Sequence, residues 1–276
     1  TLTETKATLR WNATDDASGV QEVEVWALEG NNARRLGYTE GTGARQESGT
    51  VNIRARRFGD ETRIITRGRD RVGNLLPFSD TPQLTLRFGQ PPQFRAGLHL
   101  VGIPVQLDNP DVKALFGFQT NQWSTYDPAT GQYVQHPQAA TAPQIGRGYW
   151  TLLPNAVAPN VVGNLPDPEQ PYVISLQAGW NLIANPWTEP LVWNRAAITV
   201  RTSNGEFTLD QNSARQIVEP YLWGWQPEQG RYQLVYDAQL LNGIEHQLQP
   251  WRGYWIYAHQ PCELVLPTPE TAAQGT

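Results

Sequence analysis

Short stretches in which apolar and polar side chains alternate mark the first part of the chain. Over residues 20–28, Val23 and Val25 fall on one face and Glu22 and Glu24 on the other, which is the period of a half-buried β-strand. The same pattern predicts further strands at residues 4–13, 33–39, 49–55, 61–69 and 83–88. Short strands at this spacing, without helical periodicity, predict a β-sandwich over residues 1–88.

A proline-rich segment follows the predicted sandwich. Residues 89–96 contain the pair Pro91-Pro92, which is stiff and extended. We therefore expect a linker here, followed by a second domain over residues 97–268. Residues 269–276 are mostly polar and are expected to form a tail.

The sequence of the second domain contains the same phrases twice. The phrase that begins at Gly97 returns at Gly179, after 82 residues (179 − 97). A Pro-to-Gly hairpin phrase returns after 99 residues (227 − 128), and the phrase Arg-Gly-Tyr-Trp returns after 105 residues (252 − 147). Because the order is kept, we expect two homologous halves, residues 97–165 and 172–268. Such halves predict an all-β, pseudo-twofold domain, either a barrel or a sandwich.

Each repeated phrase has a structural explanation. Gly179 opens a strand in which Trp180 and Asn181 point to opposite faces. The hairpins use proline to fix φ and glycine to accept a positive φ. A glycine follows the arginine in both copies of the third phrase, which indicates a β-bulge or a close backbone approach at Arg147, Gly148, Arg252 and Gly253. Helix is minor, with single turns predicted at residues 111–116 and 193–197.

Composition narrows the class of protein. The net charge of −5 argues against a nucleic-acid binder, since phosphate neutralisation needs a basic surface. No apolar run reaches about 18 residues, so no membrane span is expected. The single cysteine, Cys262, lies in a predicted strand, which indicates a small buried hydrophobic side chain. A start at Thr1 without Met or a signal peptide is typical of a protein processed from a secreted precursor.

Two motifs in the first domain carry a resemblance to known modules. Trp11 lies in the first alternating strand, and Asp70-Arg-Val-Gly-Asn74 precedes a proline-bearing exit. With these motifs, residues 1–88 resemble the fibronectin type III or immunoglobulin-like modules of secreted bacterial proteins. The resemblance implies that the tryptophan fills the core and that a hairpin is closed by Asp70, Gly73 and Asn74.

The duplicated phrases carry a second resemblance. Gly-Trp-Asn-Leu-Ile, Tyr-Asp-Pro-x-x-Gly and Gly-Tyr-Trp are similar to a repeat found near the carboxy ends of secreted and surface-attached bacterial proteins. The likeness covers about residues 95–268 and implies an extracellular accessory or anchoring role. The first copy departs from the pattern, because Leu98 and His99 stand where the second copy has Trp180 and Asn181.

Candidate catalytic and metal-binding residues are few. Asp15, Asp16 and Asp70 offer carboxylates for a calcium ion, and turn capping is the alternative interpretation. The histidines lack zinc-binding spacing and no nucleotide-binding or hydrolase motif is present, so no cofactor is expected. Glu245 and His246 are the best acid and base for a glycoside hydrolase, which is the last functional alternative.

Tryptophans crowd the second domain. Trp223 and Trp225 share a strand face beside a Pro-to-Gly turn, and Trp123 and Tyr126 occupy the matching phrase of the first copy. Aromatic rings fill cores, stack on sugar rings and favour protein interfaces, so all three uses stay open. These four residues are the candidate ligand or interface aromatics.

These observations favour a non-catalytic structural or adhesive module that is extracellular or at the cell surface. We expect a building block of a surface assembly, or the C-terminal accessory region of a larger secreted protein. Its expected partners are other proteins or further copies of itself. A carbohydrate-binding module with exposed tryptophans and a polysaccharide partner is the first alternative.

Overall fold

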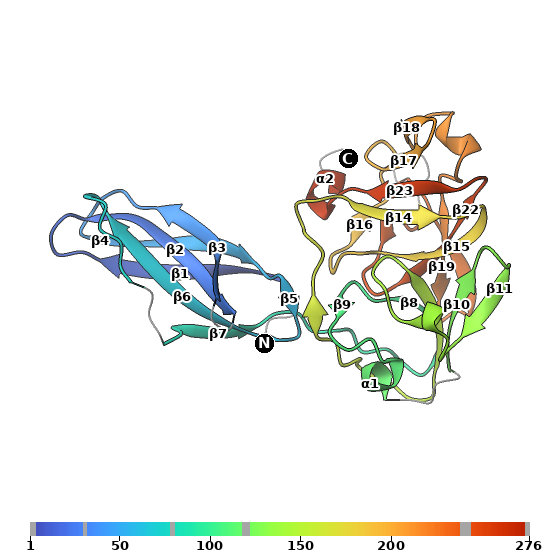
Figure 1. Ribbon diagram of the computed structural model, residues 1–276, viewed down its shortest axis with the longest axis horizontal. Coiled ribbons are helices and arrows are strands. Elements are labelled where there is room, and N and C mark those ends of the chain that lie inside the picture. Colours follow the sequence, from blue (N-terminus) through green and yellow to red (C-terminus); the bar gives the residue numbers. More distant parts are fainter. Residues whose placement is uncertain (1–3, 30–31, 78–80, 118–121, 238–243, 274–276) are drawn as a thin grey trace. The chain divides into compact units, whose positions relative to one another are not determined.

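Strands joined by turns and short loops make up most of the chain (Figure 1). The computed structural model describes residues 4–29, 32–77, 81–117, 122–237 and 244–273. The fold is all-β, as the alternating pattern predicts, and two short α-helices are found among the described residues. The chain divides into two compact units, Thr1–Gln90 and Pro91–Thr276.

The first unit is a β-sandwich built from antiparallel sheets. Its strands are β1 (Lys6–Thr14), β2 (Val20–Glu29), β3 (Asn32–Glu40), β4 (Gln46–Arg54), β5 (Arg57–Phe58), β6 (Glu61–Asp70) and β7 (Leu84–Arg87). One sheet pairs β1 with β4, and the other has the order β3-β2-β6-β7. All six strands expected in this region are present, and their ends differ from the expectation by a few residues.

The alternation along β2 sorts its side chains as predicted. Val23, Val25 and Ala27 are buried on the inner face. Glu24, on the opposite face, is buried as well, and its carboxylate accepts a hydrogen bond from Nε of Arg67 at 2.9 Å. Burial raises the pKa of Glu24, but hydrogen bonds from Arg67 and neighbouring side chains outweigh it, so the pKa lies below its ordinary value.

Trp11 is a core residue of this sandwich. Its side chain is buried, and it lies opposite Gly49 of the neighbouring strand. A Cβ atom at Gly49 would lie 2.7 Å from Cζ2 of Trp11, so the indole occupies space that only glycine leaves free.

The second unit contains two four-stranded sheets of the same design. The first copy supplies β8 (Gly97–Gly102), β10 (Trp123–Asp127), β11 (Gln132–Gln135) and β12 (Gly148–Leu153). The second copy supplies β15 (Gly179–Ala184), β19 (Leu222–Gln226), β20 (Arg231–Val235) and β22 (Gly253–Ala258). The sheet orders are β11-β10-β12-β8 and β20-β19-β22-β15, so each strand has one counterpart.

Strand register is also the same in the two sheets. Gly148 pairs with Gly102 in the first, and Gly253 pairs with Ala184 in the second. These positions are separated by 105 residues (253 − 148) and 82 residues (184 − 102), the separations of the sequence phrases. The repeated phrases therefore correspond to one repeated sheet.

Further strands cover the inner face of the second sheet. They are β14 (Tyr172–Leu176), β23 (Cys262–Leu266), β17 (Thr199–Thr202) and β18 (Gly205–Thr208), in the sheet order β14-β23-β17-β18, with the short pair β16 (Leu191–Val192) and β21 (Gln247–Leu248). In the described part of the first copy, the additional strands are just the two-residue β9 (Gln106–Leu107) and β13 (Gly163–Asn164). Trp187, Trp193 and Ile256 are in the core that results. No sheet closes among the described residues, so the domain is a sandwich rather than a barrel.

The two copies meet along a pseudo-twofold arrangement. Val101 bridges to Arg252 and, equivalently, Ile183 bridges to Arg147. At the centre, a Cβ atom on Gly102 would lie 2.1 Å from Cβ of Ala184, its own counterpart. A side chain larger than glycine therefore fits at one of these two positions but not at both.

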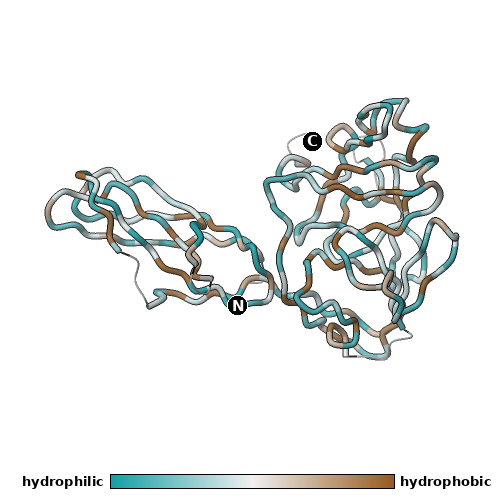
Figure 2. Tube along the Cα trace, in the orientation of Figure 1, coloured by the Kyte–Doolittle hydropathy of each residue, from teal (hydrophilic) through white to brown (hydrophobic). Residues whose placement is uncertain are grey.

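Side chains alternate along these strands between the core and the surface. Figure 2 shows hydrophobic and hydrophilic positions following one another along the strands of both units. Sheets with one buried face have this pattern. The sheet of the second copy, β15-β22-β19-β20, departs from this pattern, because both of its faces carry aromatic or aliphatic side chains.

Helical structure differs from the expectation in two places. Helix α1 (Val112–Phe116) occupies the first predicted turn, and its N-cap Asp111 accepts a hydrogen bond from the backbone N–H of Lys113. Residues 195–197 form one hydrogen-bonded turn before β17, in which the backbone N–H groups of Ala197 and Ile198 donate to the carbonyl oxygen of Asn194, so the single turn predicted at residues 193–197 is present but is not a helix. Helix α2 (Pro269–Ala273) lies in the expected polar tail, where Ala272 is fully buried and provides the apolar contact that holds it.

Candidate functional site

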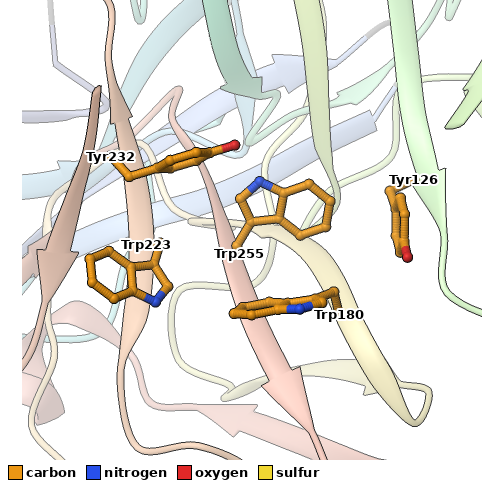
Figure 3. A pocket seen from close by; sticks show the side chains of 5 residues that line it. All are labelled: Tyr126, Trp180, Trp223, Tyr232 and Trp255. Atoms are coloured by element: carbon orange, nitrogen blue, oxygen red, sulfur yellow. The ribbon is translucent and has the colours of Figure 1, made fainter. Parts of the chain in front are cut away.

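One face of the sheet β15-β22-β19-β20 carries a set of aromatic rings. The opposite face of this sheet belongs to the main core, so alternation sends the rings outward. A cavity of about 450 Å³ opens on this aromatic face (Figure 3). The described residues that line it are all aromatic: Tyr126, Trp180, Trp223, Tyr232 and Trp255.

Trp255 lies at the centre of this aromatic cavity. Figure 3 shows its ring nearly face-on, with Trp180, Tyr126 and Tyr232 seen closer to edge-on around it. The ring of Trp180 stands at 84° to that of Trp255, with centroids 6.1 Å apart, and Tyr126 stands at 75° and 5.1 Å. Trp255 is only 9% exposed, whereas Trp180 is 40% and Tyr232 is 46% exposed. The cavity thus has a buried centre and accessible walls.

One group of rings occurs in both copies and joins them. Tyr126 packs on Trp255 of the other copy (5.1 Å, 75°), and Trp225 packs on Trp150 with nearly the same geometry (5.4 Å, 74°). The next contacts also correspond, since Tyr133 lies 6.4 Å from Trp255 and Tyr232 lies 6.5 Å from Trp150. Packing between the two copies is therefore a sufficient reason for six of the aromatic residues: Tyr126, Tyr133, Trp150, Trp225, Tyr232 and Trp255.

A second group of rings occurs only in the second copy. Trp180 of β15 has Leu98 as its counterpart, and Trp223 of β19 has Ser124. Beside them lie two tyrosines with non-aromatic counterparts: Tyr257 matches Leu152, and Tyr221 matches Gln122. Since the first copy folds into the same sheet without these rings, the fold does not require them.

Polar groups border this aromatic face. His259 Nε2 lies 3.1 Å from Oε1 of Glu219, and both side chains are partly exposed. The pKa of Tyr221 is raised, mainly by burial and in addition by the charge of Glu219 and a hydrogen bond to it. The phenol O–H therefore donates to Glu219, and its oxygen keeps lone pairs that can accept a hydrogen bond at this border.

A second, polar cavity of about 340 Å³ shares Tyr126 with the aromatic cavity. The loop before β12 contributes Gln144 and Arg147, and the chain between β14 and β15 contributes Gln177. Among the described residues, Asp127 is the only acidic side chain that lines either cavity. The two cavities together contain one carboxylate and one guanidinium.

Two of the expected ligand aromatics, Trp223 and Tyr126, line the aromatic cavity. A third, Trp225, belongs to the joint between the copies, where its indole Nε1 donates to the carbonyl oxygen of Leu98 at 2.9 Å. Both tryptophans do lie on one strand face and both are partly buried, but Trp225 packs against the other copy.

Trp123 is buried, in contrast to the expectation of a ligand or interface role. It is 1% exposed, stacks on Tyr149 (4.6 Å, 20°) and donates from Nε1 to the carbonyl oxygen of Thr141 at 2.9 Å. Strand pairing matches Trp123 with Leu222 rather than with Trp223. A shift of one residue moves a side chain to the other face of the sheet, which is why the sequence match misled.

Trp180, Tyr232 and Trp255 were not among the expected ligand aromatics. The sequence did carry a signal for Trp180, because it is a position at which the two copies differ. Trp255 and Tyr232 gave no such signal, since the first copy has an aromatic residue at each equivalent position. Only the packing of the copies shows which of these rings line a cavity.

The remaining motif residues have structural roles in this unit. Asn181 turns to the other face and donates from Nδ2 to the carbonyl oxygen of Gln177 at 2.8 Å. His99, its counterpart, makes the equivalent 2.8 Å contact to the carbonyl oxygen of Arg95. Gly179 has a positive φ of 97°. The glycines after the motif arginines permit close approach, because a Cβ at Gly148 would lie 2.8 Å from Ile183 O and one at Gly253 would lie 3.0 Å from Val101 O.

The aspartates of the first unit act as turn caps. Oδ1 of Asp15 accepts hydrogen bonds from the backbone N–H groups of residues 17–19, which lower its pKa. Asp70 accepts from the backbone N–H of Asn74 at 2.7 Å, and Gly73 takes a positive φ of 93° in this turn. Asp16 is exposed. No cluster of three or more metal-ligating side chains was found in the described parts of the chain, and these bonds support turn capping rather than calcium binding.

The candidate reactive groups are not among the described residues that line either cavity. Cys262 is buried, and burial raises the pKa of its thiol to about 11, which keeps it protonated. Oε1 of Glu245 accepts from the backbone N–H of Gln247 at 3.2 Å, and Nδ1 of His246 contacts the carbonyl oxygen of Ile244 at 3.3 Å. Neither lines a cavity described above.

Comparison with known proteins gives no family assignment. No family model and no curated protein sequence matches the chain. Among the described residues, no helix has the length and apolarity needed to cross a membrane.

Proposed function

We propose that this chain is a non-catalytic adhesive module of a secreted or surface-attached protein and that its aromatic face binds a saccharide. The observation that carries the proposal is the pair Trp180 and Trp223. Both line the cavity, and both replace small or aliphatic side chains of a sheet that has the same strand order and register.

The chemistry of the aromatic face suits a sugar. A pyranose ring has a face of C–H groups with partial positive charge, and aromatic rings present negative faces. Hydroxyl groups at the ring edge need hydrogen-bond partners once they leave water. The indole N–H groups and the border formed by Glu219, Tyr221 and His259 supply such partners.

A binding role fits the cavities better than hydrolysis. Glycosidases in general use two carboxyl groups on either side of the scissile bond. Asp127 is the one carboxylate that the described part of the chain places in these cavities, and both of its oxygens accept hydrogen bonds within its own turn. The hydrolase alternative has no such pair in either cavity.

The resemblance of the first unit to fibronectin type III or immunoglobulin-like modules supports a place outside the cell. Assembly with other proteins is a second candidate function, and exposed apolar side chains favour it. Val72 is 73% exposed and Leu76 is 64% exposed near the turn after β6. Light scattering tests it: a monomer at all concentrations, with no partner, would remove self-assembly.

Affinity electrophoresis on gels that contain polysaccharide tests saccharide binding. We expect retardation of the native chain, and its loss in Trp180→Ala and Trp223→Ala. Leu98→Ala is the matched control, because it truncates the counterpart of Trp180 in the first copy and should leave retardation unchanged.

Two outcomes would contradict the proposal. The first is the absence of retardation on cellulose-type, chitin-type, mannan and pectin gels. The second is retardation that persists unchanged in the Trp180→Ala, Trp223→Ala double variant while thermal unfolding shows a folded protein.

A further inference from the structure

We infer that the saccharide chain runs from the aromatic cavity past Tyr126 into the polar cavity, so that the protein selects oligosaccharides over single sugars. This inference rests on the proposed function. Its first observation is that the ring of Tyr126 lines both cavities, so a ligand on one side of the ring is adjacent to the other.

Arg147 supplies the donors of the polar cavity. Its side chain is partly buried, and Nε donates to Oγ1 of Thr125 at 3.2 Å, which fixes the guanidinium. No carboxylate of the described residues lies within ion-pair distance of it, so the terminal N–H groups remain available. A fixed planar donor pair suits two neighbouring hydroxyl oxygens or a sugar carboxylate.

Acceptors and further donors surround this arginine. Asp127 is held in place by the backbone N–H of Ala129 (3.0 Å) and the hydroxyl of Thr130 (2.9 Å), and its oxygens keep further lone pairs. The side chains of Gln144 and Gln177 are exposed and line the cavity. These groups match the hydroxyl-rich edge of a sugar, whereas the aromatic cavity matches its C–H face.

The other copy shows that this polar cavity is not an obligatory result of the fold. Trp225 is the counterpart of Tyr126 in the other copy. Its longer side chain donates from Nε1 to the carbonyl oxygen of Leu98 at 2.9 Å. An ion pair between Arg95 and Glu228 (3.4 Å) also spans that place. Its counterparts here are Gln177 (95 + 82) and Ala129 (228 − 99), which form no ion pair.

The two subsites make different predictions for short and long ligands. A disaccharide can occupy the aromatic cavity alone, while a longer chain reaches both cavities. We therefore expect a hexasaccharide to bind at least about tenfold more tightly than a disaccharide, which corresponds to the gain from one or two additional hydrogen bonds to charged groups.

Calorimetric titration of the full chain with cello- and chito-oligosaccharides tests this. Arg147→Ala should lower affinity for the hexasaccharide about tenfold and leave the disaccharide within about twofold. Trp180→Ala should weaken both ligands. The matched control is Arg252→Ala, which removes the counterpart arginine of the other copy and should affect neither ligand.

A second variant guards against a folding effect of Arg147→Ala. Gln144→Ala combined with Gln177→Ala removes two exposed side chains that line the polar cavity, and it should weaken only the hexasaccharide. Equal affinity for short and long ligands, or hexasaccharide affinity unchanged in this double variant, would overturn the inference and leave the proposed function intact. Absence of binding to every oligosaccharide would overturn the proposed function itself.

Discussion

The two copies of the duplicated sheet differ in what their exposed faces carry. In the first copy, Leu98 and Ser124 occupy positions held by Trp180 and Trp223 in the second. Strand order and register are the same in both, so the tryptophans are not needed to build the sheet. Comparing the copies therefore separates rings that hold the fold from rings that are free to bind a ligand.

The same comparison assigns the rings common to both copies to the joint between them. Tyr126 on Trp255 and Trp225 on Trp150 repeat the same contact within a few tenths of an ångström. A contact kept on both sides of a pseudo-twofold axis is expected where packing is the selected property. Substitutions in the two groups of rings should consequently have different effects.

The largest effect is expected for a ring in the core of the first copy. Trp123→Ala removes a fully buried indole, and it should lower the free energy of unfolding of the second unit by about 3–5 kcal/mol. Denaturant unfolding followed by tryptophan fluorescence measures this. Trp180→Ala serves as the comparison, and a loss there of less than about 1 kcal/mol is expected because the ring is partly exposed.

The next effect concerns the pseudo-twofold centre. Gly102→Ala places a Cβ 2.1 Å from Cβ of Ala184, and such overpacking should cost about 1–3 kcal/mol. Adding Ala184→Gly in the same chain moves the methyl group to the equivalent position and should restore most of the loss. Thermal unfolding measures both, and a double variant no more stable than Gly102→Ala would contradict the pseudo-twofold packing.

A smaller effect is expected on saccharide affinity. Trp180→Ala and Trp223→Ala should each weaken binding about tenfold, or about 1.4 kcal/mol, because each removes one stacking face. The converse change sharpens the comparison: Leu98→Trp with Ser124→Trp gives the first copy the same rings. Affinity for a long oligosaccharide, measured by calorimetry, should then rise. An unchanged or lower affinity would argue that tryptophans at these two positions are not the source of saccharide binding.

The smallest effect is a pH dependence confined to the first copy. Burial lowers the pKa of His99 below its ordinary 6.5, so the unfolded chain binds more protons between the two values. Stability is therefore complete above 6.5 and is lost as the pH falls toward the folded pKa. His99→Asn copies Asn181, which makes the same turn contact without titrating. The unfolding temperature of this variant should fall less steeply than that of the native chain as the pH is lowered below 6.5. An equal fall in both proteins would assign the loss of stability to other groups.

Sequence reasoning predicted the strands well because their signal is local. The alternation of Val23 and Val25 with Glu22 and Glu24 has a period of two whatever the strand packs against. The repeated phrases predicted the duplicated sheet for a similar reason, since their order and spacing fixed equivalent strands. Residues 193–197 illustrate the limit, because the sequence predicts a turn there but does not show whether the turn continues into a helix.

The candidate site was predicted only in part. Trp223 and Tyr126 line the aromatic cavity, whereas Trp123 was matched to Trp223 although strand pairing makes it the counterpart of Leu222, on the other face of the sheet. Trp225 shows a different limit: the other copy packs against its ring and accepts its indole N–H through the carbonyl oxygen of Leu98. Which rings remain accessible is decided by the packing of segments far apart in the sequence.

The central claim is that the rings found only in the second copy contact the ligand. Indole N–H signals in a heteronuclear NMR titration with a chito- or cello-hexasaccharide test it directly, because the chain has 11 tryptophans, each with one such group. We predict shifts at Trp180, Trp223 and the central Trp255, with the core residues Trp123 and Trp193 unchanged. Shifts confined to Trp11 and Trp26 of the first unit, or no shifts at any saturating ligand, would contradict the account.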